Sequence, residues 1–233
     1  MPRMTRRRAI GAGVAGIAAI GGYFTISGGG SDTPSITLRD PDGPDPATVG
    51  AGALDDTLAP PMLGDGSIGV TVFKDFACPA CGRFAREFAP QLRADYPEAI
   101  TYVHRDFPLE QLHPRARPVA NAARAVQVEA GVQAFWTFAE AAVDQEGTYS
   151  NATIEQLGDE AAGVGATART AATDRLYADR IDADLSLGRR LGVEGVPMVF
   201  VDGLYVPIQE VESLRGYYEL IDAAISRRLD TRE

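Results

Sequence analysis

The chain contains only two cysteines, Cys78 and Cys81, and two residues separate them. The β-branched and aromatic run before them, residues 68–73, favours a buried strand. After them, apolar side chains recur at helical spacing over residues 84–92, with arginine and glutamate between them, which indicates an amphipathic helix. A strand, a tight turn and a helix that begins at a Cys-x-x-Cys pair constrain the fold more than any other feature of the sequence.

This order places Cys78 at the N-terminus of the predicted helix, with Pro79 in the first turn, where a helix tolerates proline. Unpaired backbone N–H groups and the positive end of the helix dipole stabilise an anion there. A free cysteine has a pKa of ~8.5, and such a setting lowers that pKa. We therefore expect Cys78 to be the attacking thiolate of a redox-active pair. Cys81, one turn further on and more buried, is then the resolving thiol.

Two other uses of the cysteine pair are less well supported. A zinc site would need further ligands, but the chain has no second Cys-x-x-Cys pair. His104 and His113 are also further apart than the about three to five residues that separate the histidines of common zinc sites. A purely structural disulfide would close a very short loop and so remove little chain entropy from the unfolded state. We therefore predict no metal ion and no cofactor beyond the Cys78–Cys81 disulfide itself.

Residues 1–30 differ from the rest of the chain. Four arginines within the first eight residues precede an uncharged apolar run, residues 9–26, that is rich in glycine and alanine. This arrangement is typical of a twin-arginine export signal. No clear cleavage site follows, and the run is near the lower length limit for spanning a bilayer. We expect either a removed signal or an uncleaved anchor that contacts the membrane through residues 9–26. In both cases the rest of the chain acts outside the cytoplasm, where disulfides persist.

The remainder of the chain is strongly acidic. Without the four arginines of residues 1–30, it has 18 basic and 32 acidic side chains, a net charge of −14. A surface of this kind repels nucleic acid, which we exclude as a partner. Lys74 is the only lysine against 21 arginines, and together with the acidic excess this composition is halophile-like.

Two segments precede the central part of the chain. Residues 31–59 combine proline, glycine and aspartate with few large apolar side chains, which predicts a flexible spacer. Residues 60–112 begin the globular part. There, the strand and the helix described above are followed by a second strand candidate, residues 100–107. A strand–helix–strand unit of this length implies parallel pairing with a right-handed crossover.

Residues 113–185 contain no strand pattern and are predicted to be a helical insertion. Apolar side chains recur at helical spacing over residues 119–130 and 135–143, and Ser150 or Asn151 would cap a further helix. The aromatic residues Phe135, Trp136 and Phe138 are interpreted as core packing.

Residues 186–233 return to strand patterns. Two apolar runs, 196–201 and 204–206, flank Asp202-Gly203, a sequence typical of a two-residue hairpin turn. A last amphipathic helix is predicted over residues 211–229.

Several segments resemble the DsbA-like thiol-disulfide oxidoreductases, in the same order, over roughly residues 60–229. The resemblance implies an α/β fold of the thioredoxin type with an inserted all-helical domain, and Cys78 and Cys81 as the catalytic pair. The segments that carry it are Pro61–Gly64, Val72–Cys81, Arg105–Leu109 with His113-Pro114, Phe135-Trp136, Leu191–Pro197 and Val201–Gly203.

The resemblance also implies a cis-proline loop at Val196-Pro197, beside the active site. A proline there offers no N–H, and a cis bond would turn the backbone of Val196 toward Cys78, so that an extended substrate chain could pair with it. Pro197 is therefore expected to belong to the catalytic site. Val196, Pro79 and Ala80 are expected to contact the substrate. Recognition through the backbone predicts low specificity among unfolded or reduced secreted proteins.

Asp75, three residues before Cys78, has two interpretations. A partly buried carboxylate would accept or relay the proton of Cys81, and an acid at this place resembles that of several relatives. Alternatively, Asp75 ends the strand and pairs with Lys74 or solvent. His104 and His113 are interpreted as structural, since neither lies beside the cysteines in the predicted strand order.

Ala80 is a departure from the family pattern, because the strongly oxidising members carry histidine between the cysteines. Without that histidine, Cys78 would be less acidic and the disulfide less oxidising. The sequence predicts an exported enzyme that forms disulfides in secreted or cell-surface proteins and is reoxidised by a membrane-bound thiol oxidant. The alternatives are an exported reductase or isomerase, a non-catalytic chaperone or scaffold that binds extended chains, and metal delivery through the cysteines.

Overall fold

The computed structural model describes residues 59–145, 147–208 and 211–231, together with the backbone of residues 19–20, 23–26 and 36–39. The described strands form one sheet in the order β1-β2-β3-β8-β7-β5-β6-β4. Their bounds are β1 (Ala19–Ile20), β2 (Tyr23–Ile26), β3 (Ile36–Arg39), β4 (Met62–Leu63), β5 (Ile68–Lys74), β6 (Ile100–Asp106), β7 (Met198–Val201) and β8 (Leu204–Val206). The helical segments are α1 (Pro79–Arg83), η2 (Phe84–Phe88), α2 (Ala89–Asp95), α3 (Ala116–Asp144), α4 (Asn151–Ala162), α5 (Gly165–Asp174), α6 (Ala178–Arg190) and α7 (Leu214–Asp230).

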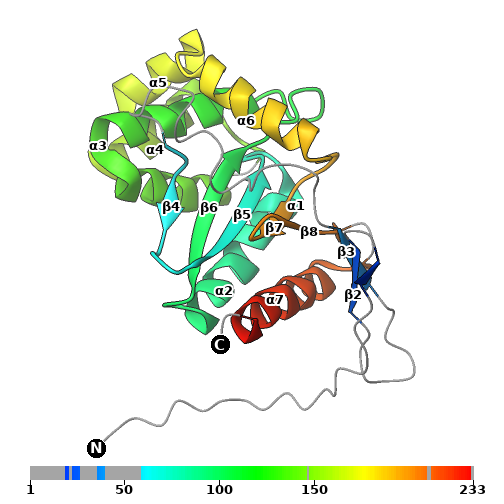
Figure 1. Cartoon of the computed structure of the whole chain (residues 1–233). Coiled ribbons are helices and arrows are strands. Elements are labelled where there is room, and N and C mark those ends of the chain that lie inside the picture. The colour runs from blue at the N-terminus through cyan, green and yellow to red at the C-terminus, as the bar shows by residue number, and fades with distance from the viewer. Residues whose placement is uncertain are drawn as a thin grey trace, which may run out of the picture.

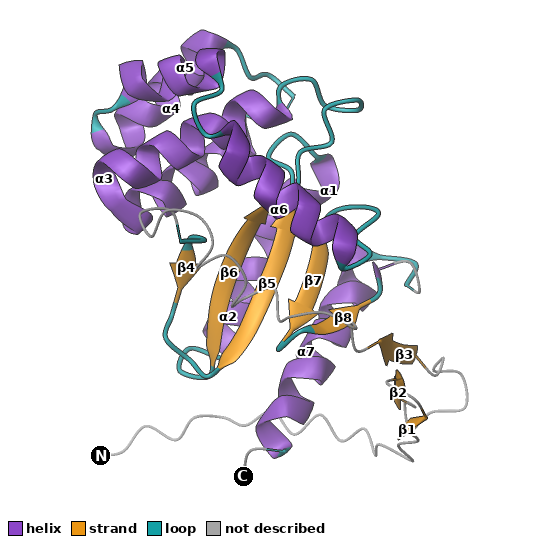
Figure 2. Ribbon diagram, turned by 45° about the horizontal axis from the view of Figure 1, so that its top comes forward, coloured by secondary structure: helices purple, strands orange, loops and turns teal. Residues whose placement is uncertain are grey.

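Helices cover both faces of the central sheet. α6 crosses one face, whereas α2 and α7 lie behind the opposite face (Figure 2). α3, α4 and α5 gather beyond one end of the sheet and pack on one another (Figure 1). The result is an α/β fold of the thioredoxin type with a helical insertion, α3–α5, between its two halves.

β5 is the central strand of this arrangement. It pairs in parallel with β6 and antiparallel with β7, so the predicted parallel strand–helix–strand unit is confirmed. β7 and β8 form the predicted hairpin. Its two turn residues, Asp202 and Gly203, have φ values of 48° and 79°, as a tight two-residue turn between twisted strands requires. Because β5 lies between two partners, the residues that follow it, from Asp75 to Cys78, emerge at the middle of the sheet.

The predicted helix that starts at the cysteines runs from Pro79 to Asp95 through α1, η2 and α2. Its middle part, η2, is a π-helical turn, which the sequence pattern did not predict. Pro90 has no N–H to donate to the residue four positions earlier, and the backbone N–H of Ala89 instead donates to the carbonyl oxygen of Phe84. The turn widens there, while Phe84 and Phe88 both stay buried.

The helical insertion agrees with the prediction in outline. α3 is interrupted at Gly131, which has φ 87° and ψ 176°, so its two parts correspond to the two helices expected from the spacing. Ser150 caps α4 by accepting a hydrogen bond from the backbone N–H of Thr153. α5 was not predicted. The boundary expected between residues 185 and 186 falls inside α6, a helix that packs on the sheet as one piece.

A cluster of buried charges joins the insertion to the sheet, and we call it the Asp184 network. The carboxylate of Asp184, on α6, accepts hydrogen bonds from Arg105 of β6 at 2.8 Å and from Arg124 of α3 at 3.2 Å. Arg124 also donates to Asp106 at 2.6 Å. Burial lowers the pKa of His104 to about 4. His104 is therefore neutral near pH 7, and its Nε2–H donates to Asp106 at 2.8 Å. All these side chains are almost completely buried.

The N-terminal predictions lie largely outside the described residues. Within the apolar run 9–26 the structure describes the short strands β1 and β2. Within the expected spacer it describes β3, whose Arg39 is paired with Tyr205 of β8. In the part of the chain that the structure describes, no helix combines the length and the apolar character needed to cross a membrane.

We predict that Asp184→Ala lowers the free energy of unfolding by about 3–5 kcal/mol, because the change leaves buried arginines without their carboxylate. Urea unfolding would measure the loss. Glu87→Ala is the matched control, since Glu87 pairs with Arg83 on an exposed helix surface and its removal is expected to cost less than about 1 kcal/mol. Equal losses in the two variants would contradict this role of the Asp184 network.

Candidate active site

The turn after β5 brings both cysteines to the start of α1. Cys78 is the N-cap residue, with extended backbone angles, and Pro79 is the first helical residue, as the sequence predicted. The backbone N–H of Cys78 donates to the carbonyl oxygen of Asp75 at 3.2 Å, which closes the turn. Cys78 is 8% exposed and Cys81 is 3% exposed. Both are free thiols, and Cys78 is the more accessible of the two.

The two thiols have opposite electrostatic properties. The Cys81 thiol donates a hydrogen bond to the sulfur of Cys78, and with the backbone N–H groups of Cys81 and Ala80 it lowers the pKa of Cys78 to about 6. Burial and the Asp75 carboxylate act against this lowering. Burial raises the pKa of Cys81 well above its ordinary value. At pH 7, Cys78 is thus mainly a thiolate, and Cys81 is a thiol.

A loop from the second half of the fold faces Cys78. The Val196–Pro197 peptide bond is cis, and the Cys78 thiol lies 3.8 Å from the carbonyl oxygen of Val196. Pro197 is buried, Val196 and Ala80 are half-buried, and Pro79 is exposed. The structure therefore brings the start of α1 at Cys78 against a loop that lies 118 residues further along the chain.

Asp75 is 1% exposed, and its carboxylate organises the turn. One oxygen accepts from the backbone N–H of Ala77 at 2.7 Å. The other accepts from the backbone N–H of Leu109 and lies 2.8 Å from Nδ1 of His113. Asp75 thus pairs neither with solvent nor with Lys74. His113 was interpreted as structural, and its contact with Asp75 was not predicted. The available signal was its place in the family-like stretch that ends at Pro114.

Lys74, the last residue of β5, is a buried lysine whose surroundings the sequence did not predict. It is only 8% exposed, and burial lowers its pKa to about 8. Its ammonium lies beside the rings of Trp136 and Tyr102. The signal was present in the strand alternation, because Lys74 shares an inward face of β5 with Val72.

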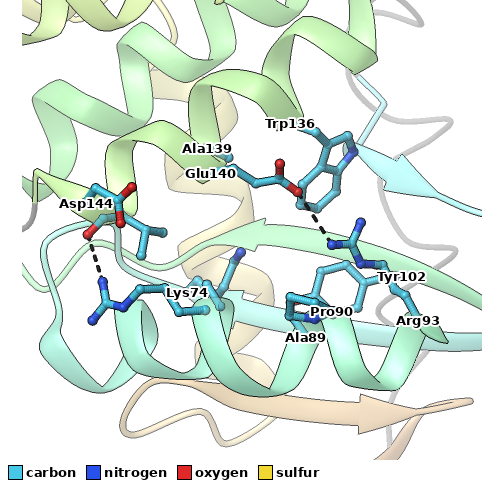
Figure 3. A pocket seen from close by; sticks show the side chains of 12 residues that line it. Lys74, Ala89, Pro90, Arg93, Tyr102, Trp136, Ala139, Glu140 and Asp144 are labelled. Atoms are coloured by element: carbon cyan, nitrogen blue, oxygen red, sulfur yellow. Dashed lines mark hydrogen bonds and ion pairs between the residues drawn. The ribbon is translucent and has the colours of Figure 1, made fainter. Parts of the chain in front are cut away.

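Lys74 lines a cavity of about 210 Å³. The cavity lies behind the helix that starts at the cysteines, Pro79 to Asp95, which we call the active-site helix. The cavity lies between this helix and the second part of α3, and Lys74 reaches into the space between them (Figure 3). The lining residues are Lys74, Ala85, Arg86, Ala89, Pro90, Arg93, Tyr102, Trp136, Ala139, Glu140, Val143 and Asp144. Among the described residues, no group of three or more histidine, cysteine, aspartate or glutamate side chains is placed to hold a metal ion.

Comparisons with known proteins identify the family and the fold. A family model described as Thioredoxin matches residues 63–223. The structure of oxidised BdbD from Bacillus subtilis is similar with a TM-score of 0.65 and 18% identity, over 73% of this chain and 93% of that chain. The thiol-disulfide exchange protein alpha-DsbA2 from Wolbachia pipientis is similar with a TM-score of 0.55 and 24% identity, over 70% and 88% of the two chains. A thioredoxin-like oxidoreductase from Silicibacter pomeroyi has a TM-score of 0.59 at 22% identity, over 73% and 93%. These structural neighbours share the fold.

The curated relatives that match this chain are much longer proteins. An Na(+)/H(+) antiporter NhaA 3 from Salinispora tropica is 31% identical over 134 residues, which is 58% of this chain. An NhaA 1 antiporter from Mycolicibacterium vanbaalenii is 34% identical over 82 residues, 35% of this chain. The matched segments span only 20% and 13% of the antiporters, so the similarity concerns a part of those proteins.

We predict that Cys81→Ala raises the pKa of Cys78 toward that of a free cysteine, because the main hydrogen-bond donor to its thiolate is removed. The pH dependence of iodoacetamide alkylation measures this value. In the wild type, the alkylation rate should rise with a midpoint at about pH 6, since Cys81 stays protonated there. An unchanged midpoint in Cys81→Ala would show that the hydrogen bond does not stabilise the thiolate.

Proposed function

The chain belongs to the thioredoxin family, and from this premise we propose that it is an exported thiol-disulfide oxidoreductase that forms disulfides in secreted or cell-surface proteins. One observation carries the proposal: the Cys78 sulfur, whose thiolate form is stabilised at the start of α1, lies 3.8 Å from the Val196 carbonyl oxygen and is followed by the exposed Pro79. The redox couple is the Cys78–Cys81 disulfide, and no cofactor takes part.

The reaction is a pair of thiol–disulfide exchanges. A client thiolate attacks the sulfur of Cys78 in the oxidised protein, because Cys78 is more accessible than Cys81. The Cys78–Cys81 bond breaks, and Cys81 leaves as a thiolate that takes up a proton. A second client thiolate then attacks the client sulfur of the mixed disulfide, and Cys78 leaves as a thiolate. The client loses two electrons, and the cysteine pair gains them.

The oxidising direction is supported by the charge state of Cys78. A reduced form that is stabilised as a thiolate makes the corresponding disulfide a stronger oxidant. With a pKa of about 6, Cys78 lies between the values of ~7 and ~3.5 that are typical of a reducing thioredoxin and of a strong oxidase. Ala80 provides no side-chain donor. The hydrogen bonds from Cys81 and from the backbone supply the stabilisation that a histidine gives in the strongly oxidising relatives.

Client recognition is proposed to use the Val196 edge. Pro197 has no N–H to offer, so the polar backbone groups of Val196 are those available for pairing with an extended client chain. Pro79 and Ala80 supply an apolar surface next to the reacting sulfur. Because few side chains take part, we expect the protein to accept many reduced clients.

Asp75 is proposed to position the site. Its carboxylate oxygens accept two backbone N–H groups and contact His113, which supports a role in fixing the turn of Ala77 and Cys78 over a role as proton relay. A carboxylate held in this way opposes ionisation of both thiols.

Export is proposed from the sequence of residues 1–30, which combines arginines with a weakly hydrophobic, uncharged run. We propose action outside the cytoplasm, with release or anchoring through residues 9–26, and reoxidation by a membrane-bound thiol oxidant. We predict that replacing Arg6, Arg7 and Arg8 together by lysine blocks export by the twin-arginine route, as measured by fractionation of the cells. Unchanged export of the triple variant would contradict the assigned route.

The central test uses two matched variants and a client protein that contains a disulfide, which the Cys78 thiolate attacks with release of the other client sulfur as a thiolate. Cys81→Ser should accumulate a mixed disulfide between Cys78 and the client, because the resolving thiol is missing. Cys78→Ser should form no mixed disulfide and should abolish turnover. Non-reducing electrophoresis with mass spectrometry measures both results. Full activity of Cys78→Ser would overturn the assignment of the nucleophile.

Three further assays separate the alternatives. An oxidase accelerates disulfide formation in a reduced client, whereas a reductase accelerates the reduction of insulin, and an isomerase rescues a client with wrong pairings. A chaperone or scaffold would bind the client without exchange in any of the three assays.

A further inference from the structure

Lys74 is a buried cation without a close counter-charge. Its Nζ lies 5.6 Å from the centroid of the Trp136 ring and 5.8 Å from that of the Tyr102 ring, and among the described residues it has no ion-pair partner. Burial lowers the pKa of Lys74 to about 8, so the side chain is still mainly an ammonium at pH 7. A buried charge of this kind costs free energy unless an opposite charge meets it.

The other charged side chains of the cavity do not supply that opposite charge. Glu140 lies 3.5 Å from Arg93, and Arg86 donates to the carbonyl oxygen of Val143 at 3.0 Å. The lining contains three cations, Lys74, Arg86 and Arg93, and two carboxylates, Glu140 and Asp144, which gives it a net charge of +1. The cavity therefore favours one small anion, although the chain as a whole has a net charge of −10.

Tyr102 provides a second unpaired polar group in the lining. Its side chain is 1% exposed, and its hydroxyl has no hydrogen-bond partner among the described residues. Burial raises the pKa of Tyr102, so the hydroxyl remains a donor. Buried polar groups are nearly always hydrogen-bonded in folded proteins. An ammonium and a hydroxyl are both donors, and a carboxylate is an acceptor that suits the two.

The remaining walls of the cavity are apolar, and its size sets the size of a ligand. The cavity volume is about 210 Å³, whereas an apolar cavity of about 150 Å³ holds benzene. There is thus room for one ring with a small substituent. Lys74 reaches into the space between the two helices, with Trp136 on the far wall (Figure 3). The apolar lining residues are Ala85, Ala89, Pro90, Trp136, Ala139 and Val143.

We propose that this cavity binds a small carboxylic acid, whose carboxylate pairs with Lys74 and whose ring or short apolar body lies against Trp136. A neutral ring would contact the walls and leave Lys74 unpaired, whereas an inorganic anion would pair with Lys74 and make no use of the walls. The inference goes beyond the proposed thiol chemistry, since neither Cys78 nor Cys81 lines the cavity.

The test compares benzoate with benzamide, which share a ring and differ in charge. Trp136 is the only tryptophan of the chain, so its fluorescence, excited where neither probe absorbs, reports binding in the cavity. We expect the wild type to bind benzoate at least about tenfold more tightly than benzamide, because hydrogen bonds to charged groups are among the stronger ones. Absence of benzoate binding, or equal affinities for the two probes, would overturn the proposal.

Lys74→Met tests the pairing directly, because methionine keeps the apolar stem and removes the charge. Its affinity for benzoate should fall at least about tenfold, while benzamide should bind as it does to the wild type. Lys74→Gln is a second neutral variant, and denaturant midpoints show which variants retain the wild-type stability. An unchanged preference for benzoate in a stable neutral variant would contradict the role of Lys74.

Arg169→Gln is the control for overall charge, since it removes an exposed cation that pairs with Glu155 on the insertion. Both affinities should stay unchanged in this variant. A loss of benzoate binding as large as that in Lys74→Met would show that only the net charge matters, against the proposal.

Two further variants locate the probe and separate this inference from the proposed function. Ala85→Leu narrows the half-buried wall of the cavity and should weaken both probes, so unchanged binding would place benzoate elsewhere and overturn the site. Cys78→Ser should bind benzoate as the wild type does, because Cys78 does not line the cavity. Benzoate binding thus stands or fails independently of thiol exchange.

Discussion

The chemistry of this protein depends on the hydrogen bonds that stabilise the Cys78 thiolate at the start of α1. The Cys81 thiol and two backbone N–H groups point at the sulfur, and this lowers its pKa although the site is largely buried. The arrangement requires Cys78 to be the N-cap residue and Cys81 to lie one helical turn further on. The Cys-x-x-Cys spacing meets that requirement, because residues three apart face the same side of a helix.

The rest of the fold holds this helix start against a second loop. β5 delivers the turn at the centre of the sheet, and β7 follows directly after the cis Val196–Pro197 bond. On the other face of the sheet, α6 approaches closely at Gly188, where an added Cβ would lie 2.7 Å from the ring of Phe107. The Asp184 network ties α6, β6 and α3 together. Together with the hydrogen bond from Arg86 of η2 to the carbonyl oxygen of Val143 in α3, these contacts attach the insertion to the rest of the fold.

The sequence was sufficient for features that depend on local pattern. The helix start at Cys78, the parallel pairing of β5 and β6, and the Asp202-Gly203 turn follow from residue type and spacing over a few residues. The sequence was not sufficient where a residue's surroundings depend on contacts between distant segments. Nothing local shows that His113 meets Asp75, or that Lys74 faces a cavity formed with α3. The π-helical turn at η2 arises from one missing N–H at Pro90, an effect that helical periodicity alone does not register.

The redox equilibrium of the Cys78–Cys81 couple with glutathione tests the account most directly. The fraction of disulfide is measured by acid quench and mass spectrometry over a range of glutathione ratios at pH 7. We expect a reversible two-electron transition, with a potential more oxidising than the about −270 mV of a reducing thioredoxin. A pair that stays reduced or stays oxidised over the whole range would contradict a redox function. A potential at or below the thioredoxin value would contradict the oxidising direction.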